Sequence, residues 1–412
     1  MLKEQFGENY KMKVLFLTMV KISSFKDRGI YTDLLRKFYE EGHEVFAVCP
    51  IERREKKKSS IRKEKEGTIL NVKTFNLQKT NIVEKGLGTL AIEYQFLSAI
   101  KKHFFKEKFD LVIYSTPPIT FSKVINFIKK RDDAYSYLLL KDIFPQNAVD
   151  MKMLKENGIL HKMFLDKEQT LYAISDTIGC MSDANKNYIL KHNPSINSSK
   201  VEINPNSVQS RDFNQNEVEK KTIRLKYNLP NDKKIFVYGG NLGKPQGLDF
   251  LLETILSATD KNVFFLIVGS GTEYDRIGKW FAEIKPKNAL LLAGLPKEDY
   301  DLLLNACDVG MIFLHKDFTI PNFPSRLLSY LEMKMPIIAA TDMNTDIGDV
   351  IEEYKCGYKV ISGDTEKMQS AIKKILSNET NYNQMKESAW NLLQAQYRVE
   401  RSYNLIKDKI NV

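Results

Sequence analysis

Two hydrophobic patterns alternate along the chain. Short runs of β-branched and aromatic residues, typical of buried strands, are separated by longer stretches with apolar residues at helical spacing. Alternation of this kind predicts βαβ units and therefore parallel sheets. In the first half we expect strands over 13–19, 44–49, 68–73, 110–115, 135–140 and 177–181, and helices over 30–41, 87–106, 120–130, 160–175 and 183–192.

The pattern breaks in a Pro- and Asn-rich stretch at 203–208 and then restarts. The second half predicts strands over 234–238, 263–268, 289–292, 309–314, 336–340 and 357–361, and helices over 247–258, 274–284, 297–306, 325–333, 366–376, 382–393 and 401–410. We therefore expect an α/β protein with two Rossmann-like domains facing a central cleft, because ligands bind beyond the carboxyl ends of such strands. The expected boundaries are a disordered extension over 1–11, domains over 12–205 and 206–395, and a helical segment over 396–412 that packs back on the N-terminal domain.

Length and composition agree with two globular domains. A chain of 412 residues is too long for one ordinary core, and 43% apolar with 28% charged residues is typical of globular proteins. No window approaches the ~20 consecutive apolar residues of a membrane span, and the pattern at the N-terminus leads us to expect no secretory signal. The four cysteines lie far apart, without metal or redox spacing, so we expect them to be buried and the protein to be cytoplasmic.

The positive charge is concentrated in the first half. Residues 1–210 hold 35 Lys and Arg against 25 Asp and Glu, which equals the excess of +10 in the whole chain. Solubility alone accounts for such an excess as readily as attraction to an anionic surface, such as phospholipid head groups or a diphosphate-linked acceptor. The basic run Arg53–Glu66 is expected to be an exposed loop and a candidate for contact with the inner face of the cell membrane. Nucleic acid is disfavoured because no nucleic-acid motif is present.

A glycine-rich turn follows the first predicted strand of the second half, in the segment Tyr238–Asp249. Glycines allow backbone N–H groups to approach a phosphate, the following helix adds a favourable dipole, and Lys244 supplies a full positive charge. An ordinary βα turn would also contain glycine. Gly269 and the glycine beside Leu295 also follow strands. Backbone amides at these positions could bind a base or a ribose.

The segment Asn322–Pro336 carries the most informative pattern. Pro324 and Ser325 favour a helix start, which places Arg326 in the first helical turn. A positive side chain at the positive, N-terminal end of a helix dipole is unfavourable. A bound anion would remove this cost and could accept hydrogen bonds from the guanidinium. The competing interpretation is a surface arginine without a role.

Three further candidates lie in the first half. Gly29 opens the first helix, where its amide could meet a diphosphate. The segments Tyr114–Pro118 and Lys141–Gln146 each follow a strand, and Asp142 is the best-placed carboxylate for an acceptor hydroxyl. A carboxylate that caps the local turn explains Asp142 equally well. None of the five histidines pairs at metal-ligand spacing.

Five segments resemble motifs of the GT-B glycosyltransferases of the family-4 type. Glu41–Val45 resembles the turn after the first helix, 239–248 the phosphate turn, and 324–339 the family's "PSKLLEYLAAGKPVIA" segment. Ser115–Pro118 and Lys141–Pro145 are similar to its acceptor-side "STPP" and "RDLWP" patterns. The similarity covers nearly the whole chain from Met12.

The finer pattern, including Ala340–Gly348, resembles transferases of O-antigen and capsule assembly assigned to L-fucosamine transfer. The chain departs from the family at two glutamate positions, which hold Pro321 and Ser329. It also has Asn241 and Gln246 where the phosphate turn usually has arginine and lysine.

The resemblance implies a retaining transferase that takes a UDP-sugar and needs no metal or other cofactor. It also implies that the N-terminal domain binds the acceptor and the C-terminal domain binds the donor. It assigns stabilisation of the leaving diphosphate to Lys244, Arg326 and the Gly29 amide, while Asp142 remains the candidate for the acceptor hydroxyl from its place after a strand. The expected donor-binding residues are Gly29, Gly240, Asn241, Leu242, Gly243, Gly269, Leu295, Asn322, Phe323, Pro324, Ser325, Leu327, Ser329 and Glu332, with Ser329 or Glu332 on the ribose; Thr116, Pro117 and Lys141 are expected on the acceptor side.

We therefore expect transfer of a deoxy-amino sugar, such as N-acetyl-L-fucosamine, to a lipid-linked saccharide in surface polysaccharide synthesis. Two alternatives use the same fold: a UDP-sugar 2-epimerase, which would need more carboxylates and histidines than this chain offers, and a non-catalytic nucleotide-sugar-binding partner, which the missing glutamates suggest.

Overall fold

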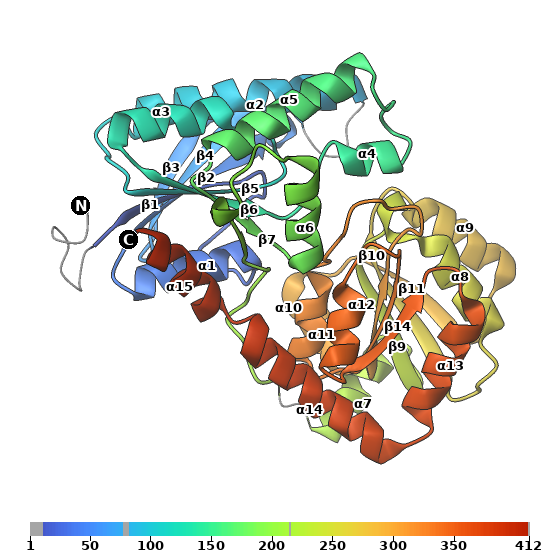
Figure 1. Cartoon of the computed structure of the whole chain (residues 1–412). Coiled ribbons are helices and arrows are strands. Elements are labelled where there is room, and N and C mark those ends of the chain that lie inside the picture. Colours follow the sequence, from blue (N-terminus) through green and yellow to red (C-terminus); the bar gives the residue numbers. More distant parts are fainter. Residues whose placement is uncertain (1–10, 77–81, 214–215, 411–412) are drawn as a thin grey trace. The chain divides into compact units, whose positions relative to one another are not determined.

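The chain folds into two compact units, each built around its own sheet (Figure 1). The computed structural model describes residues 11–76, 82–213 and 216–410. One unit comprises Met1–Gln209 with Val399–Val412, and the other Ser210–Arg398. The divisions fall a few residues beyond the expected positions 205 and 395. The predicted extension lies, up to residue 10, outside the described residues.

The sheet of the first unit is parallel except at one edge. Its order among the described residues is β3-β4-β2-β1-β5-β6-β7-β8. The strands are β1 (Lys13–Leu17), β2 (Glu44–Glu52), β3 (Ser60–Lys63), β4 (Thr68–Thr74), β5 (Leu111–Ser115), β6 (Tyr135–Leu140), β7 (Thr177–Cys180) and β8 (Val201–Ile203). In register, Leu15 of the central strand β1 lies beside Phe46 and Val112. Burial on both faces explains why these strands are continuous apolar runs.

The strand β3 corrects the expectation of a loop over Arg53–Glu66. All four of its residues are exposed, and it pairs antiparallel with β4 at the sheet edge. Its sequence carries no buried face, so hydrophobic periodicity could not reveal it. Charged residues on an edge strand also oppose unwanted strand pairing.

Helices cover both faces of this sheet. They are α1 (Ile30–Glu40), α2 (Ile82–His103), α3 (Ser122–Asp132), α4 (Gln146–Asp150), α5 (Ile159–Ile174) and α6 (Asp183–His192), with 3-10 turns η1 (Arg53–Glu55) and η2 (Ser198–Lys200). Figure 1 shows α2, α3 and α5 on one face and α1 with the C-terminal helix on the other. In the part of the chain that the structure describes, no helix is long and apolar enough to cross a membrane.

The C-terminal helix α15 (Val399–Ile410) belongs to the first unit. Tyr403 and Ile406 are buried in one core cluster with Phe38 of α1. The Tyr403 ring meets Phe38 edge-on, with ring centroids 4.9 Å apart. Its hydroxyl lies 3.0 Å from His43 Nε2. Aromatic packing and one buried hydrogen bond therefore hold the end of the chain against the unit in which it begins.

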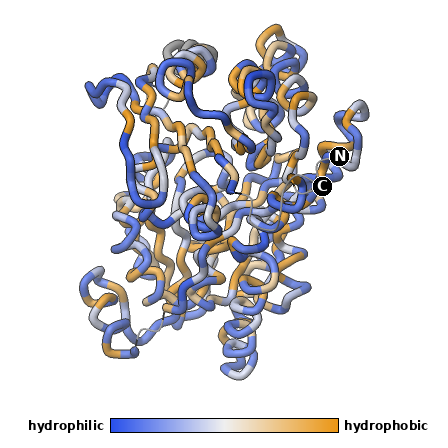
Figure 2. Tube along the Cα trace, turned by 90° about the vertical axis from the view of Figure 1, so that its left-hand side faces the viewer, coloured by the Kyte–Doolittle hydropathy of each residue, from blue (hydrophilic) through white to orange (hydrophobic). Residues whose placement is uncertain are grey.

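The sheet of the second unit is parallel throughout its described strands, in the order β11-β10-β9-β12-β13-β14. The strands are β9 (Lys234–Asn241), β10 (Val263–Ser270), β11 (Ala289–Ala293), β12 (Val309–Phe313), β13 (Ile337–Thr341) and β14 (Gly357–Ile361). The helices are α7 (Glu217–Lys226), η3 (Lys244–Gln246), α8 (Leu248–Ser257), α9 (Tyr274–Ile284), α10 (Lys297–Asn305), α11 (Arg326–Glu332), α12 (Ile347–Glu353), α13 (Thr365–Leu376) and α14 (Glu379–Gln396). The strands carry long apolar stretches, whereas the helices alternate along their length between apolar and polar residues (Figure 2).

The strand order reverses between β9 and β12. From β9 the chain first runs outward to β10 and β11 and then returns to the other side of β9 with β12. Ligands of open parallel sheets bind beyond the carboxyl ends of the strands at such a switch point. The topology therefore directs attention to the loops that follow β9 and β12.

We expect His43 to make the stability of the first unit depend on pH. Its Nδ1 accepts a hydrogen bond from the Met12 N–H at 3.2 Å, so the buried ring is neutral and Nε2 carries the proton. Burial, then Lys407, lowers the pKa of His43, against smaller opposing effects of Glu41 and Asp110. A lowered folded-state pKa contributes stability that is present above the unfolded value of about 6.5 and is lost as the pH falls below it.

The His43→Gln variant should lose about 1 kcal/mol at pH 7.5, the usual contribution of one buried hydrogen bond. Its melting temperature should fall less than that of the wild type between pH 7.5 and 5.5. Parallel pH dependence of the two proteins in thermal melts would contradict the role given to this ring.

Candidate functional site

The turn after β9 brings backbone groups unusually close together. Gly240 has φ of +122°, a conformation that residues with a Cβ rarely adopt. A Cβ on Gly269, near the end of β10, would lie 1.9 Å from the Gly240 carbonyl oxygen. Neither position accepts a side chain, so the carboxyl ends of β9 and β10 present bare backbone at the place where the sequence predicts a phosphate.

The remaining residues of this turn fall into two groups. Leu242 is fully buried, and its amide donates to the Ser270 carbonyl at 2.9 Å, so this amide already has a partner. Asn241 and Lys244 are exposed. Lys244 begins the 3-10 turn η3, for which Gly243 is the N-cap, and no ion pair of Lys244 occurs among the described residues.

Arg326, the first residue of α11, reaches from the loop after β12 to the turn after β9. Its Nη2 donates a hydrogen bond to Oε1 of Gln246. Its guanidinium lies 4.3 Å from the centroid of the Tyr238 ring, a cation–π contact. Its Nη1 is buried and has no hydrogen-bond partner. The two loops at the switch point are therefore joined by an arginine with an unused donor.

The surroundings of Arg326 are aromatic rather than acidic. The titratable side chains that face it are those of Tyr238, Tyr330 and Tyr300, and no carboxylate pairs with it within the described ranges. An arginine is always protonated in proteins, and a buried charge without a counter-ion is costly. The arrangement is therefore chemically suited to an anion: a bound phosphate would supply both the opposite charge and the missing acceptor.

Tyr330 ties the helix α11 to the strands of the switch point. Its hydroxyl accepts from the Gly239 N–H at 3.2 Å and lies 3.1 Å from the Met311 carbonyl of β12. A Cβ on Gly310 would lie 2.4 Å from the Tyr330 ring. Close packing of this ring on glycine therefore fixes the position of the helix that begins at Arg326.

The loop before α11 is held by the loop after β13. The Asn322 amide donates to Thr345 Oγ1 at 3.0 Å, and Thr345 in turn donates to Asp342. Burial raises the pKa of Asp342, against the hydrogen bonds from Thr345 and Asn344. The side-chain Nδ2 of Asn322 is buried without a hydrogen-bond partner, so this loop also presents an unused donor.

The other predicted residues of this loop and helix differ in exposure. Phe323 and Pro324 are half-buried, Ser325 is exposed, and Leu327 is buried in the core. Ser325 is the N-cap, as expected, but its side chain makes no capping hydrogen bond. The Phe323 ring lies 6.1 Å from that of Tyr397.

The two residues proposed for the ribose have different environments. Ser329 is half-buried on α11. Glu332 is buried, and its Oε1 accepts from the Arg211 N–H at 2.9 Å. A ribose contact of Glu332 would have to compete with this hydrogen bond, which leaves Ser329 as the simpler of the two predictions.

The last two donor candidates stand at other strand ends or in the other unit. Leu295 is half-buried in the loop after β11. Gly29 is the N-cap of α1 in the first unit, and its amide donates to Asp33 Oδ1 at 3.3 Å. The predicted diphosphate contact of Gly29 would therefore replace an existing hydrogen bond.

On the acceptor side, Thr116 organises the carboxyl ends of β5 and β6. Its Oγ1 donates to the Asp142 carbonyl and accepts from the backbone amides of Lys141 and Asp142, at 3.0 to 3.2 Å. Pro117 beside it is exposed. The two predicted acceptor segments are thus joined through one hydroxyl.

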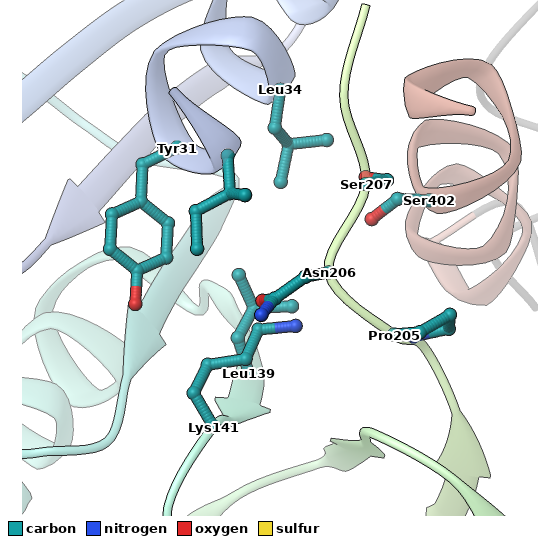
Figure 3. Close-up of a pocket in the computed structure, with 9 residues that line it drawn as sticks. Tyr31, Leu34, Leu139, Lys141, Pro205, Asn206, Ser207 and Ser402 are labelled. Carbon is teal, nitrogen blue, oxygen red and sulfur yellow. The ribbon is translucent and has the colours of Figure 1, made fainter. Parts of the chain in front are cut away.

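Lys141 points into a pocket of about 10 Å³, the size of one hydroxyl group or water. Its Nζ donates to the Asn204 carbonyl at 3.2 Å. Figure 3 shows the amine and the Asn206 side chain directed toward each other, and Oδ1 of Asn206 is buried without a partner. Burial lowers the pKa of Lys141 to about 7.

Asp142 is directed to a different set of groups. Its Oδ2 accepts from Nδ2 of Asn147 at 2.7 Å. Burial raises the pKa of Asp142 to about 6, although the hydrogen bonds from Asn147 and Ile143 oppose this. Burial also raises the pKa of nearby Glu168 to about 7, against a hydrogen bond from Tyr172. A carboxyl group that titrates near neutral pH is suited to proton transfer.

Sequence reasoning missed the partners that define these sites. Gln246 and Tyr238 flank the glycine-rich turn and contact Arg326, and Tyr330 lies one helical turn after it. One feature of the sequence could have indicated the contact. Gln246 replaces the family's usual lysine, and its side-chain oxygen can accept a hydrogen bond from an arginine. Nothing in the sequence places Asn206 beside Lys141, because the contact depends on how β8 ends.

Residues 219–391 match the family described as "Glycosyl transferases group 1". The probable glycosyltransferase WbjE of Pseudomonas aeruginosa is 22% identical over 299 residues, which are 72% of this chain and 73% of that protein. The putative colanic acid biosynthesis glycosyl transferase WcaI of Escherichia coli K12 is 27% identical over 135 residues, 32% of each chain.

The fold as a whole is similar to that of Anabaena HepE, whose structure was solved in complex with UDP-glucose. The TM-score is 0.68 at 12% identity, over 97% of this chain and 99% of that one. The chain therefore carries a group 1 glycosyltransferase domain in a two-domain GT-B-like fold, and it is a glycosyltransferase.

Proposed function

We propose that the protein transfers a sugar from a UDP-sugar, with retention of configuration, to a lipid-linked saccharide during synthesis of a surface polysaccharide. The observation that carries the proposal is the half-buried Arg326, whose buried Nη1 has no hydrogen-bond partner. A relative named for colanic acid biosynthesis and a structural neighbour solved with UDP-glucose agree with it. The likeness of Ala340–Gly348 to fucosamine transferases suggests N-acetyl-L-fucosamine as the sugar.

In this proposal Arg326 stabilises the leaving diphosphate. Negative charge grows on the β-phosphate as the glycosidic bond breaks, so a fixed cation beside it lowers the barrier. Gln246 and Tyr238 hold the guanidinium in place without neutralising it. Lys244, exposed in the adjacent turn, would add a second cation. These side chains would do the work that a metal ion does in other transferases.

Asp142 is the group that we assign to the acceptor hydroxyl. Ionised, it can accept the proton that the hydroxyl loses on attack. Thr116 fixes its backbone and Asn147 its Oδ2, and the Ile143 amide donates to the same carboxyl group. The hydroxyl-sized pocket of Lys141 lies one residue away.

The direct test is a transfer assay. Purified protein with a panel of UDP-sugars and a lipid-diphosphate-linked saccharide should give product with one donor, and that donor should raise the melting temperature. Formation of an epimer without acceptor would instead indicate an epimerase. Tight donor binding with no product across the acceptor panel would indicate a non-catalytic binding partner.

Arg326→Ala should lower kcat by about 10²- to 10³-fold, the usual effect of removing one donor to a developing anion. Gln246→Glu should also weaken UDP binding, because a carboxylate beside the guanidinium would compete with the phosphate as an ion pair. Lys279→Ala, an exposed residue of α9, is the matched loss of one positive charge and should behave as the wild type. Turnover by Arg326→Ala equal to that of this control would remove Arg326 from the mechanism.

Asp142→Asn should lower kcat/KM by about 10²-fold or more, as loss of a general base does. In the wild type, kcat/KM should fall as the pH drops through about 6, since protonation of Asp142 removes the base. The variant should lose this acid limb. Glu168→Gln is the control, because its carboxyl titrates near 7; an acid limb that disappears in Glu168→Gln and persists in Asp142→Asn would reassign the base.

A further inference from the structure

The connection from α4 to α5 exposes large apolar side chains. Met153 is 68% exposed, and Ile159 and Leu160, the first residues of α5, are 87% and 56% exposed. Three large exposed apolar residues thus fall within eight positions of the chain. Contiguous exposed apolar groups mark interaction surfaces.

This connection has a defined conformation. The Met153 amide donates to the Ala148 carbonyl at 2.8 Å. The Asn157 amide donates to Nδ1 of the buried His161 at 3.1 Å. On the inner side of α5, Phe164 packs edge-on against Phe144, with ring centroids 5.1 Å apart. The apolar side chains of the connection are therefore exposed, while the hydrogen bonds and the ring contact fix the residues around them.

Positive charge accompanies the apolar residues. Lys152, Lys155 and Lys162 are exposed, and none of them forms an ion pair within the described residues. Glu156 is the acidic residue between them. We call Lys152, Met153, Lys155, Ile159, Leu160 and Lys162 the connector surface.

The basic run that the sequence singled out is different. Around β3, Arg54 pairs with Glu52 and Arg62 with Glu64. Its one large exposed apolar residue is Ile61, at 40% within the described part of the run. The run remains strongly basic, but it has little apolar surface to insert into a membrane.

The connector surface also follows directly on the acceptor-side residues. Phe144, which anchors α5, belongs to the segment that contains Lys141 and Asp142. Only the short helix α4 (Gln146–Asp150) separates that segment from the connection. A membrane at the connector surface would therefore lie next to the part of the unit that we assign to the acceptor.

We propose that the connector surface docks on an anionic lipid bilayer, with Met153, Ile159 and Leu160 entering the boundary between head groups and acyl chains and the lysines contacting lipid phosphates. This combination of apolar insertion and positive charge is what surface-bound proteins use. The inference rests on the proposed function only in that a lipid-linked acceptor gives the docking a purpose. It differs from the run around β3 in offering large exposed apolar side chains beside the lysines.

The test is sedimentation of the full chain with phosphatidylcholine vesicles, with and without phosphatidylglycerol. Wild type should bind the anionic vesicles and bind neutral ones about tenfold or more weakly. Combined substitution Met153→Ser, Ile159→Ser and Leu160→Ser should weaken anionic binding by about tenfold or more. Lys152→Gln, Lys155→Gln and Lys162→Gln together should do the same and should flatten the dependence on salt.

The matched control is Leu225→Ser, Leu256→Ser and Ile284→Ser, three exposed apolar residues of the second unit, at 67%, 59% and 47% exposure. It should bind vesicles as the wild type does. Equal melting temperatures and equal turnover of a soluble acceptor analogue would show that the connector variants remain folded.

Three results would overturn the inference: no binding of the wild type to anionic vesicles, binding by the connector variants equal to that of the control, or loss of self-association in the connector variants. The last result would assign the surface to contact between copies of the chain. Vesicle binding does not need transfer, so a protein that binds through the connector surface but forms no product would contradict the proposed function alone.

Discussion

Parallel pairing of strands is the constraint on which both units depend. Strands that run in the same direction end at the same edge, so the turns that follow them gather there whatever their distance in sequence. In the second unit the order reverses between β9 and β12. Lys244 and Gln246 stand in the turn after β9, and Arg326 in the loop after β12. Residues 80 positions apart thus meet at one point, and the site follows from the topology before any ligand is considered.

A second constraint acts at that point, namely the cost of burying charge. Arg326 is surrounded by tyrosines, has one side-chain acceptor in Gln246 and keeps an unused Nη1. A carboxylate in place of Gln246 would satisfy the arginine and reduce its attraction for a phosphate. The glutamine at this position, where the family usually has lysine, therefore has a physical explanation. It is a neutral partner that holds the charged Arg326 without neutralising it. In the first unit the same cost acts on Lys141 and Asp142, where burial moves both pKa values toward neutrality.

Much of the fold could be predicted because burial and periodicity coincide. Strands such as β6 and β14 and helices such as α6 and α9 have the bounds that their hydrophobic pattern indicates. The hydrophobic pattern did not predict elements in which burial and periodicity do not coincide. The strand β3 is wholly exposed, and α7 is a charged helix that Arg224 fastens through an ion pair to Asp308 at 2.6 Å. The helix α4 is too short for helical spacing to show, and it leads into the connection whose exposed apolar residues look, in sequence, like any buried run.

The sequence by itself determined the class of fold and the glycine-rich turn, and it singled out Arg326 as a candidate, because chain order, hydrophobic spacing and the chemistry of single residues suffice for these. Tertiary structure decided which groups have partners. It pairs Glu332 with the Arg211 amide and the Gly29 amide with Asp33. It also places Gln246 and Tyr238 against Arg326. The side chains of Met153, Ile159 and Leu160 are exposed. Hydrogen-bond partners and exposure depend on contacts between distant segments, and no local pattern in the chain encodes them.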